Sequence, residues 1–218
     1  MNAVKPTLSP RKMPVQARST ATLEAIFAAT IQVLLQIGFE NLTTTFENLT
    51  TTKVALRAGV SVGTLYQYFP NKSALLAAVL EQYLATVICA VESACNAAKG
   101  QSASSIAKAM VNAYIDAKLG NAQAAKALHS VAHELGGAEI RARMMQRYQI
   151  ALCDALATAS NAKFNDLKTL SFVLSSAMGG PVLALLMADP TPQQIAVLRE
   201  HLTTLASTYL TQYASHYA

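Results

Sequence analysis

The stretch from Lys53 to Leu76 restricts the fold of this chain more than any other part of the sequence. It reads KVALRAGVSVGTLYQYFPNKSALL and holds two short segments with a helical apolar pattern. Gly59 ends the first segment and Pro70 ends the second, because glycine and proline are common helix stops. Two short helices must therefore be joined by a tight turn, which predicts a helix-turn-helix motif.

The residue types around the turn support this interpretation. Ala55 and Ala58 are small enough to allow two helices to cross closely. Gly59 can adopt the positive φ that the turn needs, Val60 is placed to fill the core, and Ser61 can cap the following helix.

The second helix of the motif has two different faces. The apolar face comprises Val62, Leu65 and Phe69. The opposite face is polar, uncharged and small, with Tyr66 and Tyr68 on its flanks, and it comprises Gly63, Thr64 and Gln67. Such a helix can approach a DNA major groove closely. An ordinary helical hairpin with a solvated outer face is the alternative.

Charge and helix position also favour a polyanionic partner near the N-terminus. The chain has a formal net charge of +5, and residues 1–72 contribute +4 of it. Lysine and arginine side chains that neutralise phosphates release counterions, which favours binding to DNA. Lys72 adds a positive charge at the start of the next helix, which suits a phosphate. A basic but merely solvated N-terminal tail is the alternative.

The whole chain is predicted to be all-α. Apolar residues make up 52% of its 218 residues, glycine and proline are sparse, and no strand-like alternation stands out. We expect a flexible basic arm at 1–17, a three-helix DNA-binding domain at 18–70 and a larger helical domain at 71–218. Asn71 or Ser73 caps the long helix that opens the larger domain. Further helices are expected near 102–118, 121–135, 138–160, 165–188 and 191–214.

A run of twenty uncharged residues, 169–188, is long enough to cross a membrane. Its serines, its threonine and a Gly-Gly-Pro interruption favour a helix buried in a core or subunit interface instead. A membrane-associated or interaction protein without DNA binding remains the alternative function. The three cysteines form no CxxC pair, and no signal peptide is recognisable, so we expect reduced thiols and a cytoplasmic location.

The run LTTTKVALRAGVSVGTLYQYFPNKSALL closely resembles the N-terminal signature of TetR-family transcriptional regulators. This resemblance implies a homodimeric, ligand-responsive repressor that binds double-stranded operator DNA. It implies contacts to the DNA backbone from Thr50, Thr51, Thr52, Thr64, Tyr66, Tyr68 and Lys72. It also implies that Val62, Gly63 and Gln67 face the bases. The dimer would form through the last two helices, near Leu170–Met187 and Ile195–Tyr213, without a membrane.

An effector pocket is expected among the middle helices, for a small hydrophobic or aromatic molecule. Residue type selects Met110, Tyr114, His129, His133, Met144, Met145, Tyr148, Phe172 and Met178, although such residues are often simple core. His129 and His133 have metal-capable spacing beside Glu134, but HSVAHE lacks the HExxH order, so no metal is predicted. No catalytic constellation and no cofactor motif is present, which argues against an enzyme.

One feature departs from the family pattern. The heptapeptide FENLTTT occupies residues 39–45 and is repeated at once at 46–52, between the first and second helices of the predicted DNA-binding domain. A longer loop is energetically mild, since doubling loop length costs about 0.6 kcal/mol. We expect both domains to fold, with Thr50 or Thr51 capping the second helix and the first copy forming a longer connection. This change should weaken operator binding.

Overall fold

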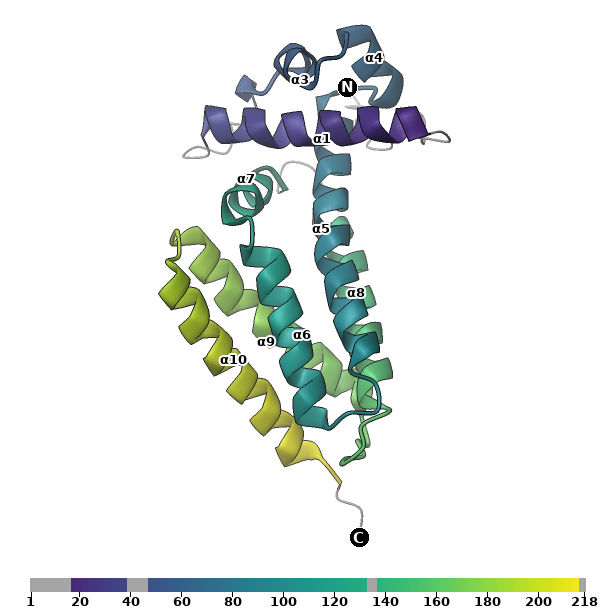
Figure 1. Ribbon diagram of the computed structural model, residues 1–218, viewed down its shortest axis with the longest axis vertical. Coiled ribbons are helices and arrows are strands. Elements are labelled where there is room, and N and C mark those ends of the chain that lie inside the picture. The colour runs from purple at the N-terminus through teal and green to yellow at the C-terminus, as the bar shows by residue number, and fades with distance from the viewer. Residues whose placement is uncertain (1–16, 39–46, 133–136, 216–218) are drawn as a thin grey trace, which may run out of the picture. The chain divides into compact units, whose positions relative to one another are not determined.

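The structure is a computed structural model of the chain, and it describes residues 17–38, 47–132 and 137–215. Helices account for most of these residues, in agreement with the all-α prediction (Figure 1). β structure in the described ranges is limited to a bridge between Lys163 and Ser215. The helices are α1 Ala17–Ile37, α3 Thr51–Ala58, α4 Val62–Tyr68, α5 Lys72–Ala97, α6 Ala103–Leu119, α7 Ala122–Ala132, α8 Gly137–Leu156, α9 Leu167–Met187 and α10 Pro192–Tyr213.

The chain forms two compact units. The first unit contains Met1–Tyr83 and Gln123–Ile140, and so includes α1, α3, α4, the beginning of α5 and most of α7. The second unit contains Leu84–Ala122 and Arg141–Ala218, and so includes the rest of α5, α6, most of α8, α9 and α10.

In the first unit, α1 forms the base on which the two short helices are held. α1 packs against α3, and its inward face is apolar because Ile26, Val33 and Leu34 are buried. The aromatic rings of Phe27 and Phe69 lie 6.0 Å apart and connect α1 to the end of α4. Burying large apolar side chains supplies most of the stabilisation of such a small helical unit.

Local capping sets where the short helices begin and end. The Thr50 side chain accepts a hydrogen bond from the Lys53 amide and caps α3, as one of the two predicted alternatives. Gly59 ends α3 with a φ of +68°, in the left-handed region that glycine favours. The Ser61 hydroxyl accepts from the Thr64 amide at 2.9 Å and caps α4. Asn71 Oδ1 accepts from Ala74 N at 2.8 Å and caps α5.

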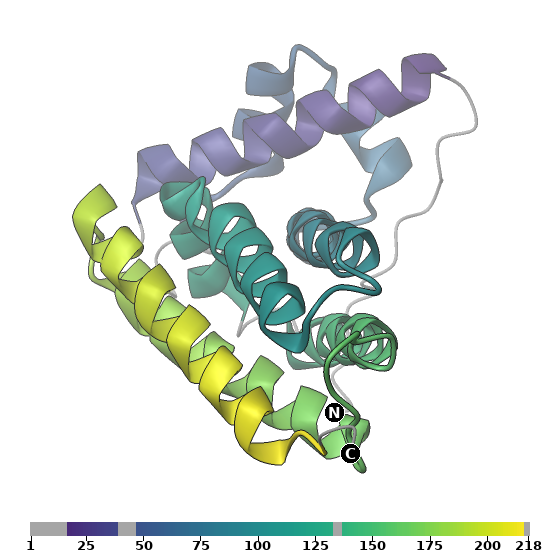
Figure 2. The same cartoon turned by 60° about the horizontal axis from the view of Figure 1, so that its bottom comes forward.

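In the second unit, α10 packs along α6 and α9, as Figure 2 shows. A polar cluster at one point fastens α10 to α6. The Arg199 guanidinium contacts the Asp116 carboxylate at 2.5 Å and also donates to the Asn112 side-chain oxygen at 3.1 Å. This partly exposed ion pair fixes the register of the two helices more than it adds to stability.

The apolar segment of α9 is a long helix that continues through Pro181. Its inner face includes two buried serines, Ser171 and Ser175. Ser171 lies 3.1 Å from the Cys153 thiol of α8, and the Ser175 hydroxyl donates to the Phe172 carbonyl oxygen at 3.0 Å. By length and composition alone, Ser19–Ile37, Lys72–Ala97 and Leu167–Met187 could each cross a membrane.

Candidate nucleic-acid interface and effector cavity

The outer surface of α4 has the polar and open character that the sequence predicts. Tyr66 is 42% exposed and Gln67 is exposed. Val62, which the helical pattern assigned to the apolar face with Leu65 and Phe69, is instead 36% exposed. Gly63 has no side chain, so the surface of α4 is flat at this position. A Cβ atom added there would lie 3.6 Å from the Ser61 hydroxyl oxygen, so there is room for one. A flat helix surface without bulky side chains can lie close to base edges.

Hydroxyl groups join α3 and α4 at the edge of this surface. Thr51 Oγ1 lies 3.3 Å from the Tyr66 hydroxyl oxygen, and Thr50 and Thr52 beside it are exposed. On the other side of α4, Ser61 Oγ and Thr64 Oγ1 lie 2.8 Å apart. Hydroxyl groups of this kind can contact phosphate oxygens. Such contacts position a protein on DNA but do not distinguish one base sequence from another.

Lys72 brings a positive charge to the start of α5. Its ammonium group donates to the Glu47 carbonyl oxygen at 3.5 Å, so it also connects α5 to the second copy of the repeat. Burial lowers the pKa of Lys72, and the Glu47 carboxylate partly opposes this shift. The first copy of the repeat lies outside the described residues.

Tyr68 does not lie where the sequence pattern placed it. We expected it on the flank of the polar face, but its side chain is buried, with 8% exposed. Its ring lies 6.3 Å from the Phe69 ring, on the core side of α4. Tyr68 follows the buried Leu65 by three residues, and positions three apart share one face of a helix, so the Tyr68 ring lies on the inner face of α4. A contact between Tyr68 and the DNA backbone stays a prediction.

The second unit contains a cavity of about 130 Å³ between four helices. Most of its wall is apolar or aromatic. The lining comprises Leu84, Val87 and Ile88 from α5, Tyr114 and Lys118 from α6, Arg141, Met144, Met145 and Tyr148 from α8, and Ser175 from α9. Four of the predicted effector contacts are thus brought together, namely Tyr114, Met144, Met145 and Tyr148.

Two tyrosines form the centre of the cavity wall. The Tyr114 and Tyr148 rings lie 5.8 Å apart in an edge-to-face arrangement. The Tyr148 hydroxyl donates to the Met110 sulfur at 2.9 Å, which places Met110 behind the wall. Burial raises the pKa of Tyr114 to about 12 and raises that of Tyr148 well above its usual value. Both rings are therefore neutral at physiological pH.

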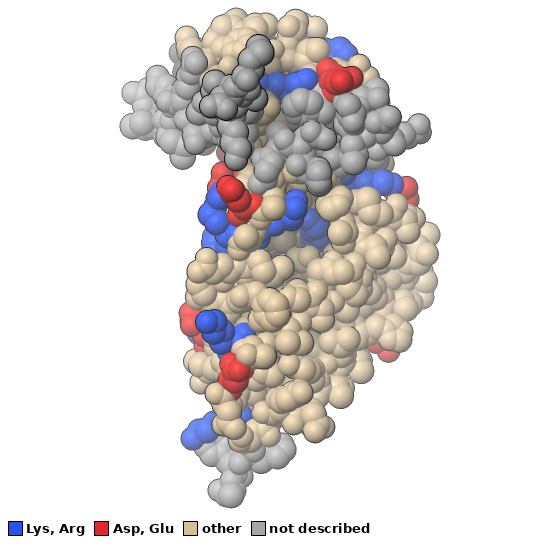
Figure 3. All heavy atoms as spheres, turned by 180° about the vertical axis from the view of Figure 1, so that it is seen from behind, with Lys and Arg blue, Asp and Glu red and all other residues tan. Residues whose placement is uncertain are grey.

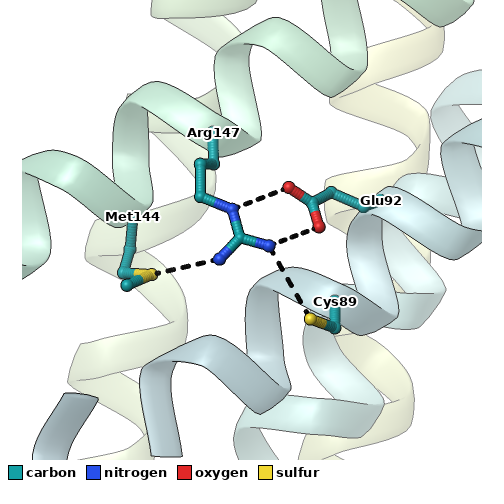
Figure 4. Close-up of polar contacts among 4 residues, drawn as sticks. All are labelled: Cys89, Glu92, Met144 and Arg147. Carbon is teal, nitrogen blue, oxygen red and sulfur yellow. Dashed lines mark hydrogen bonds and ion pairs between the residues drawn. The ribbon is translucent and has the colours of Figure 1, made fainter. Parts of the chain in front are cut away.

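A charged group holds the α5 and α8 walls together (Figure 4). The Arg147 guanidinium donates two hydrogen bonds to the Glu92 carboxylate, at 2.8 and 2.6 Å. It also contacts the Cys89 and Met144 sulfurs, at 3.7 and 4.0 Å. The hydrogen bonds to Glu92, followed by the contact with Cys89, raise the pKa of Arg147 further above its usual value. These two parallel hydrogen bonds hold α5 and α8, which both line the cavity, in a fixed relative position.

Comparison with known families agrees with both units. Residues 46–79 match the family model described as "Bacterial regulatory proteins, tetR family". Residues 104–210 match the model described as "Tetracyclin repressor-like, C-terminal domain". The chain belongs to the TetR family of transcriptional regulators. It is a DNA-binding transcriptional regulator with a helix-turn-helix motif, in a family of non-enzymatic transcription factors, as the sequence resemblance implied.

Solved structures confirm the fold. The fatty acid degradation regulator FadR from Bacillus halodurans has 20% identity and a TM-score of 0.67, over 85% of this chain and 94% of that one. FadR from Bacillus subtilis, solved with stearoyl-CoA, has 16% identity and a TM-score of 0.62, over 85% and 98%. A TetR-family regulator from Streptomyces coelicolor has 22% identity and a TM-score of 0.59, over 88% and 99%. No curated protein matches the chain by sequence.

α9 and α10 of this TetR-family protein expose several large apolar side chains. Figure 3 shows a face of the second unit on which charged residues are sparse. Tyr209 and Tyr213 pack ring against ring at 4.8 Å on α10. The exposed apolar residues of the two helices are Phe172, Val173, Met187, Val197, Leu205 and Tyr213. Such a surface is unusual on an isolated monomer.

Four further predicted effector contacts, Met110, His129, Phe172 and Met178, do not line the cavity. Met110 and Met178 are fully buried, whereas Phe172 is 56% exposed on α9. His129 lies in the first unit and is half-buried. His133 and Glu134 lie outside the described residues. Within the described residues, no group of three or more His, Cys, Asp or Glu side chains is arranged to hold a metal ion.

Sequence reasoning missed the charged residues of both regions. Lys118 and Arg141 line the cavity, but they are not among the methionine, histidine and aromatic residue types that suggested an effector site. On α3, Lys53 and Arg57 are exposed near the predicted interface. Their positive charge at helical spacing was a signal that could have added them to the list of phosphate contacts.

Proposed function

We propose that this TetR-family regulator is a homodimeric repressor that binds double-stranded operator DNA through α3 and α4. The observation that carries this proposal is the exposed, uncharged surface of α4 with the Thr51 and Tyr66 hydroxyls at its edge. DNA-binding motifs of this type place such a helix in the major groove. Residues 18–70 then form the DNA-binding domain, residues 71–218 bind the effector and form the dimer, and the protein acts in the cytoplasm.

The side chains divide by the part of the DNA that they contact. Gln67 can hydrogen-bond a base edge, while Val62 and Gly63 allow close approach. Lys72 supplies a charge-assisted contact to a phosphate. The other contacts to the backbone come from Thr50, Thr51, Thr52, Thr64, Tyr66 and Tyr68.

The exposed apolar face of α9 and α10 supports dimerisation through these helices. Phe172 on α9 and Tyr213 on α10 are more than half exposed, at 56% and 57%. In a dimer, two helices from each subunit form a four-helix bundle that removes these side chains from water. A bundle between subunits buries this apolar face without a membrane, so the proposal includes no lipid contact.

The effector occupies the cavity between α5, α6, α8 and α9. Ligand sites usually measure about 300–1,000 Å³, so a cavity of about 130 Å³ suits a small molecule or must widen on binding. The Bacillus subtilis FadR carries a long-chain acyl-CoA, which is far larger than this space. The spacing of the two α4 helices in the dimer must match the DNA. A ligand that binds more tightly to a dimer with another spacing shifts the population away from the DNA-bound state.

The repeated heptapeptide should weaken operator binding. The second copy corresponds to the single copy that the family pattern expects before the second helix. Leu49 is buried, Thr50 caps α3 and the family match begins at Phe46. The first copy adds seven residues between α1 and this cap. Because α1 supports α3 and α4, a longer connection gives the reading surface more freedom, and ordering it on DNA costs affinity.

Deletion of residues 39–45 tests this part of the proposal. Binding to the DNA upstream of the gene is measured by gel shift, and the deletion should raise affinity. A control variant replaces residues 39–45 with seven glycine and serine residues, which keeps the length and changes the sequence. It should bind as weakly as the natural chain. Equal affinity of the deletion and the natural chain would refute an effect of the repeat.

The DNA-binding proposal is tested by the double variant Tyr66→Ala, Lys72→Ala on the same upstream DNA. The natural chain should retard this DNA, and the variant should not. Circular dichroism and the thermal midpoint establish that the variant is folded. Retardation of the DNA to the same extent by both proteins would contradict the proposal.

A further inference from the structure

The two tyrosines of the cavity wall differ in the bonds of their hydroxyl groups. The Tyr148 hydroxyl donates to the Met110 sulfur at 2.9 Å, so this donor is in use. Tyr114 lines the same cavity, and its ring lies edge to face with the Tyr148 ring. In the described part of the chain, this ring contact is the interaction that Tyr114 makes, and its hydroxyl has no hydrogen-bond partner.

The surroundings of the Tyr114 hydroxyl are poor in water. Burial raises the pKa of Tyr114 to about 12, which is the direction expected for a phenol withdrawn from water. Among the described residues, no completely enclosed side-chain nitrogen or oxygen lacks a partner, so this hydroxyl touches open space, and the cavity is the space that Tyr114 lines. A polar group in such a place costs free energy until it finds a partner.

The other polar groups of the wall are in a different situation. The Ser175 hydroxyl donates to the Phe172 carbonyl oxygen at 3.0 Å. Arg141 is exposed to solvent, and Lys118 has interaction partners in the protein. The rest of the lining is apolar and comprises Leu84, Val87, Ile88, Met144 and Met145. Tyr114 therefore combines a donor without a partner with surroundings that are short of water.

The volume of the cavity limits the ligand to about one ring. An engineered apolar cavity of about 150 Å³ in another protein binds benzene, and this cavity measures about 130 Å³. The flexible, polarisable side chains of Met144 and Met145 can adapt to an apolar body, and the tyrosine rings can pack against it. A single six-membered ring with one small polar substituent therefore fits both the volume and the wall.

We propose that the effector is a one-ring molecule with a hydroxyl or carbonyl oxygen, and that this oxygen accepts a hydrogen bond from the Tyr114 hydroxyl. This inference rests on the proposal that the cavity is the effector site. The ring of the ligand lies against Tyr148, Met144 and Met145. A phenolic hydroxyl offers one donor, which matches one hydroxyl or carbonyl oxygen. Phenols, cyclic alcohols and cyclic ketones belong to this class.

The test pairs each oxygen-bearing ligand with a hydrocarbon of similar shape, on purified protein without DNA. Isothermal titration calorimetry measures the binding of phenol and toluene, and of cyclohexanone and methylcyclohexane. Tyr114→Phe should weaken binding of phenol and cyclohexanone by about three- to tenfold, the value of one hydrogen bond, and keep the affinity for both hydrocarbons within about twofold. Each comparison stays within one ligand, so differences in hydration between ligands cancel.

Tyr148→Phe is the matched control, because it removes a hydroxyl of the same cavity that is already bonded to Met110. It should not weaken the oxygen-bearing ligands more than their hydrocarbons. Circular dichroism establishes that both variants are folded.

The inference is overturned if neither phenol nor cyclohexanone binds, if Tyr114→Phe weakens both members of a pair alike or neither, or if Tyr148→Phe gives the selective loss. The DNA-binding proposal is tested separately by gel shift of the ligand-free protein. Its failure is therefore distinguishable from failure of the Tyr114 contact.

Discussion

The hydroxyl oxygens of Thr51 and Tyr66 lie 3.3 Å apart, which joins the first turn of α3 to the middle of α4. Two residues fifteen positions apart in the sequence thus present their hydroxyl groups at one place on the first unit. Because both groups can also bond a phosphate oxygen, this pair lies at the edge of the proposed DNA-binding surface.

Tyr66→Phe should lower operator affinity by up to about tenfold, since it removes one hydroxyl contact worth about 1 kcal/mol. The ring is exposed, so the free energy of unfolding should change by less than about 0.5 kcal/mol. Fluorescence anisotropy with labelled upstream DNA measures the affinity, and urea denaturation measures stability. Ser160→Ala, which removes an exposed hydroxyl group between α8 and α9, is the control and should leave DNA affinity unchanged.

Lys72→Gln should weaken operator binding in a salt-dependent way. The loss of one phosphate contact reduces the slope of log affinity against log salt by about 1 per subunit. Lys99→Gln removes an exposed charge at the end of α5 and should not alter the slope. A Lys72→Gln protein with the natural slope would contradict a phosphate contact by the Lys72 ammonium group.

Gly59→Ala should lower the stability of the protein, whereas Gly63→Ala should lower its affinity for DNA. Gly59 has a φ of +68° with nothing within 4 Å, so alanine costs about 1–2 kcal/mol of stability through backbone strain alone. Gly63 lies within α4, where alanine fits and favours the helix. Its methyl group, however, holds α4 away from the bases, so Gly63→Ala should lose operator affinity and keep its stability. Thermal unfolding measures the stability of each variant, and fluorescence anisotropy measures its affinity for the upstream DNA.

Helix positions were predictable because their signals are local. Gly38, Gly59, Pro70 and Gly100 each follow a helix end in the structure, and the predicted helices agree with the observed ones to within a few residues. Ser61 and Asn71 cap the helices that the sequence assigned to them. A cap or stop acts over one turn, so the residues around it are sufficient to identify it.

The direction of side chains and their tertiary neighbours were harder to predict from the sequence. Tyr68 was expected on a flank of α4, yet it is buried, because it lies three residues after Leu65 on the inner face of the helix. Lys118 and Arg141 are far apart in sequence, and only the packing of α6 against its neighbours brings them to one cavity. Residue type alone predicted four of the cavity residues and could not exclude Phe172, which is exposed.

The most direct test of the central claim, that α3 and α4 bind operator DNA, is a salt titration on the DNA upstream of the gene. The protein is measured with residues 39–45 present and deleted. The account predicts that log affinity falls linearly with log salt, with a slope of several units in both proteins, and that the deletion binds more tightly at every salt concentration. A slope near zero in both proteins would contradict DNA binding by this surface.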